Sequence, residues 1–392
     1  MTSSNNKHSI LLGTHEKHIH SVIFDSEART LTRGASTARP EQPSWLIRHP
    51  VHPNIIYSNA WVDNKLYVHR LKGEDGSLEL LGEADSGGEG PTHFAVLPGN
   101  KELVVAHYRS GSISVIPLEP SGLFAAPSPA PHRIFKTTYS PLKHYRQEAA
   151  HVHQVVLHDN EILTPDLGAN KVWRWKWNAG ADEGKGKLEL VGEISEGLED
   201  GDGPRHLVVH PSGSHVYVLN EVSSSLTVHT LPAPGSGELS RLVKRFSMLP
   251  PSDDKANDRP TGGAEIILLP PCTSRADAGA EDGSMLLLCS NRDTPVAGQE
   301  DTIALFKVSP TNGGQVERTK AGWLGGIGKH IRAVEKDNFT KDGRFVCVAS
   351  RDEGRVVILE RVDDEDGEGK GLGLKAVASL DGFEKVVVPL WI

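Results

Sequence analysis

Four residues of this 392-residue sequence could together transfer protons to and from an anionic substrate: His153, Arg205, Glu221 and Arg292. A histidine can accept and return a proton because its ordinary pKa lies close to neutral pH. Two guanidiniums can hold a carboxylate or a developing oxyanion. A glutamate can orient the histidine or share the proton transfer. The same residues could instead form a ring of structural ion pairs, so their chemistry depends on how the fold arranges them.

The stretch 151–175 shows the structural unit that must position these side chains. Two histidines one residue apart open an apolar strand, and a turn at 159–160 leads into a second strand. A polar loop at 166–170 precedes a third strand. Residues 9–24 resemble the second and third strands of another unit, and residues 384–390 resemble a first strand. Copies of the whole unit begin near residues 44, 92, 205, 264 and 330.

This repeat predicts an all-β fold, a single seven-bladed β-propeller that spans residues 1–392. The N-terminal blade lacks an inner strand, which we expect the C-terminal strand to supply, because ring closure removes exposed strand edges. Residues 1–8 are expected to be flexible. The predicted blades are 9–43 with 384–390, 44–91, 92–150, 151–203, 204–262, 263–328 and 329–383.

The composition agrees with many short strands and excludes several partners. There are 40 glycines and 25 prolines, without a period, and no window has a sustained helical pattern of apolar residues. A net charge of −9 argues against a nucleic-acid surface. The three cysteines form no CxxC pair, and no apolar run could span a membrane. We therefore expect a soluble, cytoplasmic protein, and the sequence leaves its oligomeric state open.

Blade geometry places the candidate residues on one face of the propeller. The start of each first strand and the end of each second strand lie on this face, as do the long connections 119–150 and 247–262. Connections of this length are usually functional or disordered. The first strands open with Ser44, Thr92, His153, Arg205 and Ala264. The second strands end with Asn59, His107, Asp166, Glu221, Arg292 and Arg351.

Several segments resemble a known family, the seven-bladed propeller lactonases. This family includes bacterial propeller-type 6-phosphogluconolactonases and fungal 3-carboxy-cis,cis-muconate cyclases. The resemblance covers most of the chain from residue 9 to about 360. It is carried by residues 12–15, 91–96, 108–115, 151–156, 165–172, 203–207 and 219–222.

The resemblance implies roles for individual residues. The family's proposed catalytic groups fall on the same four residues that blade geometry selects, His153, Arg205, Glu221 and Arg292. Glu265 occupies a position where members of the family often have an aspartate, whereas the sequence around His330 and Arg332 departs from the family pattern. We expect substrate contacts from His151, Asp166, Glu265 and Arg332.

The predicted function is a lactonase that opens a sugar lactone of the 6-phosphogluconolactone type by adding water. A covalent acyl-enzyme is not expected, because no G-x-S-x-G motif occurs. A phosphorylated sugar would require further basic groups, for which Lys329, Arg332 and Arg351 are candidates. An unsaturated diacid would require only Arg205 and Arg292.

Three alternatives remain open at this stage. The first is a cycloisomerase that forms a lactone, as in the carboxymuconate cyclases. The second is a non-catalytic propeller that binds a small molecule or serves as an interaction scaffold, since the fold alone does not decide function. The third is a metal site built from His151, His153, Asp166 and Glu221. The family that the sequence resembles needs no metal, so we expect neither a metal nor another cofactor.

Overall fold

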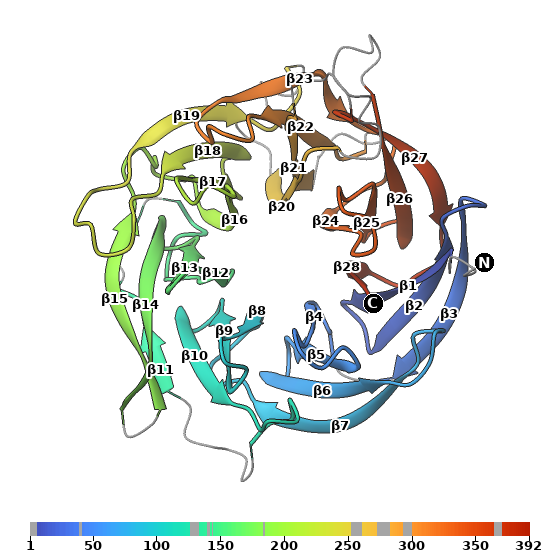
Figure 1. Cartoon of the computed structure of the whole chain (residues 1–392), viewed down its shortest axis with the longest axis horizontal. Coiled ribbons are helices and arrows are strands. Elements are labelled where there is room, and N and C mark those ends of the chain that lie inside the picture. The colour runs from blue at the N-terminus through green and yellow to red at the C-terminus, as the bar shows by residue number, and fades with distance from the viewer. Residues whose placement is uncertain are drawn as a thin grey trace.

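Seven four-stranded antiparallel sheets surround a common axis in the described part of the chain (Figure 1). The structure is a computed structural model. It describes residues 6–38, 41–125, 133–138, 142, 144–182, 185–251, 261–272, 283–292, 300–363 and 371–392. The arrangement confirms the predicted seven-bladed β-propeller.

Each blade runs from an inner strand at the axis to an outer strand at the rim. Blade 1 contains β28 (Val386–Trp391), β1 (Lys7–Thr14), β2 (His18–Asp25) and β3 (Thr30–Ala38). Blade 2 contains β4 (Leu46–Arg48), β5 (Ile55–Ala60), β6 (Lys65–Leu71) and β7 (Leu78–Asp85). Blade 3 contains β8 (Pro91–Val96), β9 (Glu102–His107), β10 (Ser112–Pro117) and β11 (Arg133–Lys136). Blade 4 contains β12 (Val156–His158), β13 (Glu161–Asp166), β14 (Lys171–Asp182) and β15 (Lys185–Ile194).

The remaining three blades repeat this order. Blade 5 contains β16 (Pro204–Val209), β17 (His215–Asn220), β18 (Ser225–Thr230) and β19 (Leu242–Ser247). Blade 6 contains β20 (Gly262–Leu269), β21 (Met285–Arg292), β22 (Ile303–Val308) and β23 (Val316–Leu324). Blade 7 contains β24 (Ile331–Lys336), β25 (Phe345–Ser350), β26 (Arg355–Val362) and β27 (Gly373–Leu380).

The C-terminal strand closes the ring. Strand β28 pairs antiparallel with β1, so that Ile10 lies opposite Trp391, and this confirms the predicted closure. The expectation of a flexible segment up to residue 8 was wrong at its end, because Lys7 and His8 already belong to β1. Both residues pair with β2, and the ring of His8 stacks on Phe339 of blade 7 at a centroid distance of 3.4 Å. Tertiary packing therefore orders this end of the chain.

The hydrophobic core lies between neighbouring blades. Alternate strand residues face the next blade, so each sheet buries apolar side chains on both of its faces. Between blades 7 and 1, for example, Phe24 contacts Phe345 edge to face at 5.0 Å and Trp391 at 6.1 Å. All three side chains are buried in one cluster with residues of both blades. This packing makes the blades a rigid frame for side chains at the axis.

A β-bulge near the start of the inner strand recurs around the ring. In blade 5 the pairing of β16 with β17 shifts by one residue between Pro204 and His206, so Arg205 is an extra residue in the ladder. Bulges redirect side chains and are frequent beside active sites. The residues at the corresponding position of the other blades with this shift are Thr92, His153, Ala264 and Arg332, together with Val387 of blade 1.

Parts of both long connections, which we expected to be functional or disordered, lie outside the described residues. These parts are 126–132, 139–141, 143 and 252–260. The described end of the first connection, residues 144–150, is nevertheless informative, because it reaches the candidate site. In the described chain, no helix is long and apolar enough to cross a membrane.

The closure predicts that Trp391 contributes strongly to stability. Its side chain is 2% exposed, and its indole N–H donates to the carbonyl oxygen of Glu335 at 3.1 Å. We expect Trp391→Ala to lower the free energy of unfolding by about 3–5 kcal/mol, because it leaves a cavity between blades 7 and 1. Urea unfolding measures this change when it is followed by circular dichroism of the backbone rather than by tryptophan fluorescence. Leu239→Ala, at a side chain that is 76% exposed, should change it by less than about 0.5 kcal/mol. Equal midpoints for the two variants would contradict the prediction.

Candidate active site

Glu221 is the centre of a buried charge cluster. Its side chain is 1% exposed and lies directly after β17. Nη2 of Arg292 donates to its Oε1 at 2.5 Å, Nε of Arg205 forms an ion pair with its Oε2 at 2.8 Å, and Nη2 of Arg146 donates to Oε1. Burial alone would raise the pKa of Glu221, but the three guanidiniums hold that pKa well below its ordinary value. Glu221 is therefore ionised. It orients arginines, whereas we expected it to orient His153 or to share the proton transfer.

Arg205 is held on two sides. Only 2% of its side chain is exposed, and its Nη1 donates to the carbonyl oxygen of Ala264 in the next blade. Burial lowers the pKa of Arg205 to about 10 despite the opposing effect of Glu221, so the group is still charged at neutral pH. Two of its three nitrogens are engaged by described residues, and Nη2 is the nitrogen that could contact a ligand.

Arg146 and Tyr108 belong to this cluster, and our sequence interpretation missed both. Arg146 comes from the end of the connection between blades 3 and 4, and it also forms a side-chain hydrogen bond with Tyr108. Gln147, the next residue, donates to the carbonyl oxygen of Leu167 at 2.8 Å and to Oδ1 of Asn170 at 3.1 Å. The unusual length of this connection was the one available signal, but it named no residue.

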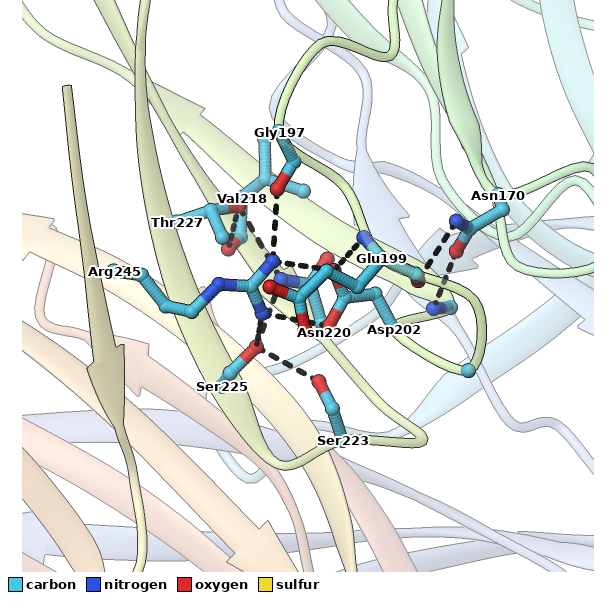
Figure 2. Close-up of polar contacts among 12 residues, drawn as sticks. Asn170, Gly197, Glu199, Asp202, Val218, Asn220, Ser223, Ser225, Thr227 and Arg245 are labelled. Carbon is cyan, nitrogen blue, oxygen red and sulfur yellow. Dashed lines mark hydrogen bonds and ion pairs between the residues drawn. The ribbon is translucent and has the colours of Figure 1, made fainter. Parts of the chain in front are cut away.

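A second polar network fixes the segment that leads into Arg205 (Figure 2). Asn170 donates to the carbonyl oxygen of Glu199 at 3.0 Å and accepts from the backbone N–H of Gly203 at 2.9 Å. The carboxylate of Asp202 binds both terminal nitrogens of Arg245, at 2.8 and 2.7 Å. Arg205 therefore enters the site from a backbone that is held from blades 4 and 5.

His153 lies beside the charge cluster. Its side chain is buried, and its ring makes edge contacts with Tyr108 at 5.8 Å and His206 at 5.0 Å between centroids. Its buried Nδ1 has no hydrogen-bond partner among the described residues. Burial, followed by the charge of Arg205, lowers the pKa of His153 well below its ordinary value. The ring is therefore in its basic, uncharged form at neutral pH.

Two of the expected substrate contacts, His151 and Asp166, have structural positions instead. The oxygens of Asp166 accept from the backbone N–H groups of His151 at 2.7 Å and Ala169 at 2.9 Å, and from the side chains of Thr137 at 3.0 Å and Trp173 at 3.1 Å. Nδ1 of His151 bonds the carbonyl oxygen of Tyr108, and its ring stacks on that tyrosine. Their polar atoms are already satisfied, so the structure does not place them for a ligand.

Glu265, the third expected contact, lies on the far side of His206 from His153. It is 4% exposed, and its Oε1 lies 2.6 Å from Nδ1 of His206. Burial raises the pKa of Glu265 to about 8 and lowers that of His206 well below its ordinary value. Burial thus favours the uncharged forms of both groups, while the backbone N–H of Ile266 also donates to Oε1 of Glu265 at 3.1 Å. Glu265 also lines a cavity of about 340 Å³ with Trp45, Glu335 and Trp391.

Arg332, the fourth expected contact, does lie close to the cluster. It occupies the bulge position of β24, equivalent to Arg205 in blade 5. Burial, followed by the charges of Arg205 and Arg292, lowers the pKa of Arg332 well below its ordinary value, whereas Glu221 opposes this effect. Part of the side chain remains accessible. The structure thus brings Arg332 together with the four predicted catalytic residues.

A register difference explains why Tyr108 was missed. We aligned His107 and Asp166 with Glu221 at the ends of the second strands. In the structure, His107 and Asp166 occupy the position one residue before that of Glu221 in the pairing with the first strand. The residue of blade 3 that is equivalent to Glu221 is Tyr108. A shift of one residue moves a side chain to the other face of a strand. The residues equivalent to Glu221 include His15, Tyr108, Leu167, Arg292 and Arg351.

The alternative metal site is not assembled. Its four proposed ligands were His151, His153, Asp166 and Glu221, and three of them are engaged in the hydrogen bonds and ion pairs described above. Among the described residues, no group of three or more histidine, cysteine, aspartate or glutamate side chains could hold a metal ion. The residues present do not fit a resident metal, and we derive no step through one.

The fold and the site together define a seven-bladed propeller with a histidine beside an arginine-rich cluster. A family model for the seven-bladed beta-propeller lactonases matches residues 9–376. The chain belongs to this lactonase family.

Individual relatives are distant but cover most of the chain. A 6-phosphogluconolactonase of Bacillus subtilis is 26% identical over 358 residues, which is 89% of this chain and 88% of the relative. A 6-phosphogluconolactonase of Formosa agariphila is 26% identical over 80% of this chain and 79% of the relative. A crystal structure from Bacteroides fragilis has a TM-score of 0.78 at 23% identity and covers 100% and 99% of the two chains. A periplasmic gluconolactonase of Pseudomonas aeruginosa has a TM-score of 0.73 at 20% identity, with 98% and 99% covered.

The protonated Glu265 predicts a pH dependence of stability. Below about pH 4.5 the carboxyl is protonated in both the folded and the unfolded chain. Between that pH and about 8 only the folded chain keeps the proton, so stability falls as the pH rises. Relative to Glu265→Gln, the wild type should lose about 2–4 kcal/mol of unfolding free energy between pH 5 and pH 8. Urea unfolding at both pH values measures this difference. A difference that does not change with pH would show that Glu265 is ionised in the folded protein.

Proposed function

We propose that the protein hydrolyses a sugar lactone of the 6-phosphogluconolactone type without a metal ion. The observation that carries this proposal is the uncharged ring of His153 beside guanidiniums that Glu221 orients; its Nδ1 has no hydrogen-bond partner in the described parts of the chain. Such a site can remove a proton from water and stabilise negative charge on a carbonyl oxygen. The names of the curated relatives support the substrate class.

The first step is the addition of water to the lactone carbonyl. His153 accepts a proton from water as the water oxygen forms a bond to the carbonyl carbon. The carbonyl π electrons move to oxygen, and the resulting oxyanion is stabilised by Arg292 and by Nη2 of Arg205. Glu221 contributes by holding both guanidiniums in place, so little reorganisation is needed as the charge develops.

The second step opens the ring. The oxyanion re-forms the carbonyl, the bond between the carbonyl carbon and the ring oxygen breaks, and protonated His153 returns its proton to that oxygen. The product is an open-chain hydroxy acid, which ionises to a carboxylate and releases one proton. Because His153 first gains and then returns a proton, its depressed pKa assists the return. No acyl-enzyme is required.

Hydrolysis is favoured over the alternatives that we left open. Lactone formation from an unsaturated diacid could use the same histidine and arginines, but the curated relatives described above are 6-phosphogluconolactonases. A scaffold without catalysis would not need a buried cluster of like charges. Location in the cytoplasm stays a prediction, and one structural neighbour is a periplasmic enzyme.

We expect His153→Asn to lower kcat for opening of 6-phosphogluconolactone by about 10²- to 10⁴-fold, because the general base is lost. The asparagine keeps a polar side chain of similar reach. The rate is measured as proton release in a weakly buffered solution, with correction for spontaneous hydrolysis.

His158→Asn is the matched control, because His158 is the last residue of β12, whereas His153 precedes that strand, and His158 faces Asp159 at 3.7 Å. This variant should keep the wild-type rate. Full activity of His153→Asn would overturn the assigned role, and conversion of a carboxymuconate but of no lactone would favour the cycloisomerase.

The reaction should not depend on a divalent metal. We expect the rate to stay within about twofold of its starting value after dialysis against EDTA, because the histidine and the arginines supply the base and the charge stabilisation. Metal content after dialysis is checked by elemental analysis. Activity that disappears with EDTA and returns with one added metal would contradict the proposed mechanism.

A further inference from the structure

Arg332 holds a position in the fold that otherwise carries site residues. It is the bulge residue of β24, as Arg205 is in β16, and His153 lies at the matching place before β12. Equivalent bulge residues leave the inner strand at the same height, so Arg332 faces the axis beside the cluster. Its electrostatic effects on His153 and on His15 of blade 1 agree with this placement.

The cluster has an unbalanced charge. Three guanidiniums, those of Arg146, Arg205 and Arg292, share the single carboxylate of Glu221. Arg332 makes no hydrogen bond or ion pair with any described residue. The neighbouring histidines do not add a counter-charge, and burial keeps Glu265 protonated below about pH 8. Among the described residues, these four guanidiniums lie near one carboxylate, and an excess of positive charge in a largely buried site costs free energy unless an anion enters.

The other two basic candidates from the sequence are less suitable. Arg351 lies near the same end of the axis, but its Nε already donates to Oδ1 of Asp352 at 2.8 Å. Lys329 belongs to the segment before β24, where its backbone N–H is bound by Glu353. A lysine is a point charge, whereas a guanidinium can bind two phosphate oxygens at once. Within the described parts of the chain, Arg332 is the one of the three candidates that combines a guanidinium without an ion-pair partner with a place beside the cluster.

We propose that Arg332 binds the phosphate group of a phosphorylated sugar lactone and thereby selects it over the unphosphorylated lactone. The proposal rests on the lactonase function proposed above. The lactone carbonyl would lie near His153 and Arg292, and the distant phosphate would reach blade 7, which neighbours the blade of Arg292. The phosphate dianion would supply the counter-charge that the described residues do not provide for Arg332.

The test compares two substrates in Arg332→Met, which keeps an apolar stem but removes the charge. We expect kcat/KM for 6-phosphogluconolactone to fall about 10- to 100-fold, as for the loss of a charge-assisted hydrogen bond. For unphosphorylated gluconolactone it should change less than about threefold. Arg332→Lys should lose less than Arg332→Met on the phosphorylated substrate. If Arg332→Met does not fold, the comparison of the two lactones in Arg332→Lys tests the proposal instead.

Arg351→Met is the matched control, because it removes a guanidinium at the same end of the axis that Asp352 already pairs. It should leave both values of kcat/KM within about threefold of the wild type. An equal loss on both lactones in Arg332→Met, or no loss on either, would overturn the proposal. So would a selective loss of the same size in Arg351→Met, since it would indicate a long-range field.

Binding of inorganic phosphate separates this proposal from the proposed function. Millimolar phosphate should raise the Tm of the wild type by a few degrees and leave that of Arg332→Met unchanged. Without phosphate, the variant should melt at or above the wild-type Tm, because it lacks a partly buried charge that has no ion-pair partner among the described residues. If the wild type opens neither lactone, the lactonase function fails, and loss of phosphate protection in the variant still supports the anion site. If phosphate raises the Tm of the wild type and of Arg332→Met equally, the proposed anion site at Arg332 is overturned.

Discussion

The structure of the site depends on the ion pairs of one buried carboxylate. Glu221 is nearly inaccessible, and its charge is stable there only because Arg146, Arg205 and Arg292 surround it. The three arginines come from a connecting loop and from blades 5 and 6. Glu221 therefore ties three distant segments together and fixes the direction of each guanidinium. Removal of this carboxylate would leave like charges buried against one another.

The propeller supports this arrangement through its repeated bulge. Six of the inner strands carry an extra residue near their start in the described chain, and the same backbone position presents His153, Arg205 and Arg332 toward the axis. The apolar contacts between blades make the frame rigid, so loops need not position these groups. Polar networks such as that of Asn170 and Asp202 hold the segments that lead into the bulges. The site can therefore concentrate positive charge at a cost that the rest of the fold offsets.

Much of the architecture could be predicted from the sequence. The strand repeat, the missing inner strand of the first blade and its replacement by the C-terminal strand follow from alternating apolar residues and from the need to close sheet edges. His153, Arg205, Glu221 and Arg292 could be selected because blade geometry assigns strand ends to one face. The role of Glu221 was misjudged, since it binds arginines instead of the histidine. Asp166 and His151 were chosen for their chemistry and Glu265 for its place in the family pattern, although hydrogen bonds within the fold engage all three.

The propeller, its ring closure and the face that carries the candidate chemistry can be inferred from the sequence, because they depend on local patterns repeated along the chain. The membership of the cluster depends instead on contacts between distant segments. Arg146 reaches Glu221 across 75 residues of sequence, and Tyr108 joins it through a one-residue register that a bulge sets. Charge pairing depends on distances and burial between blades, which no spacing along the chain encodes. The same reason separates the unpaired Arg332 from the paired Arg351.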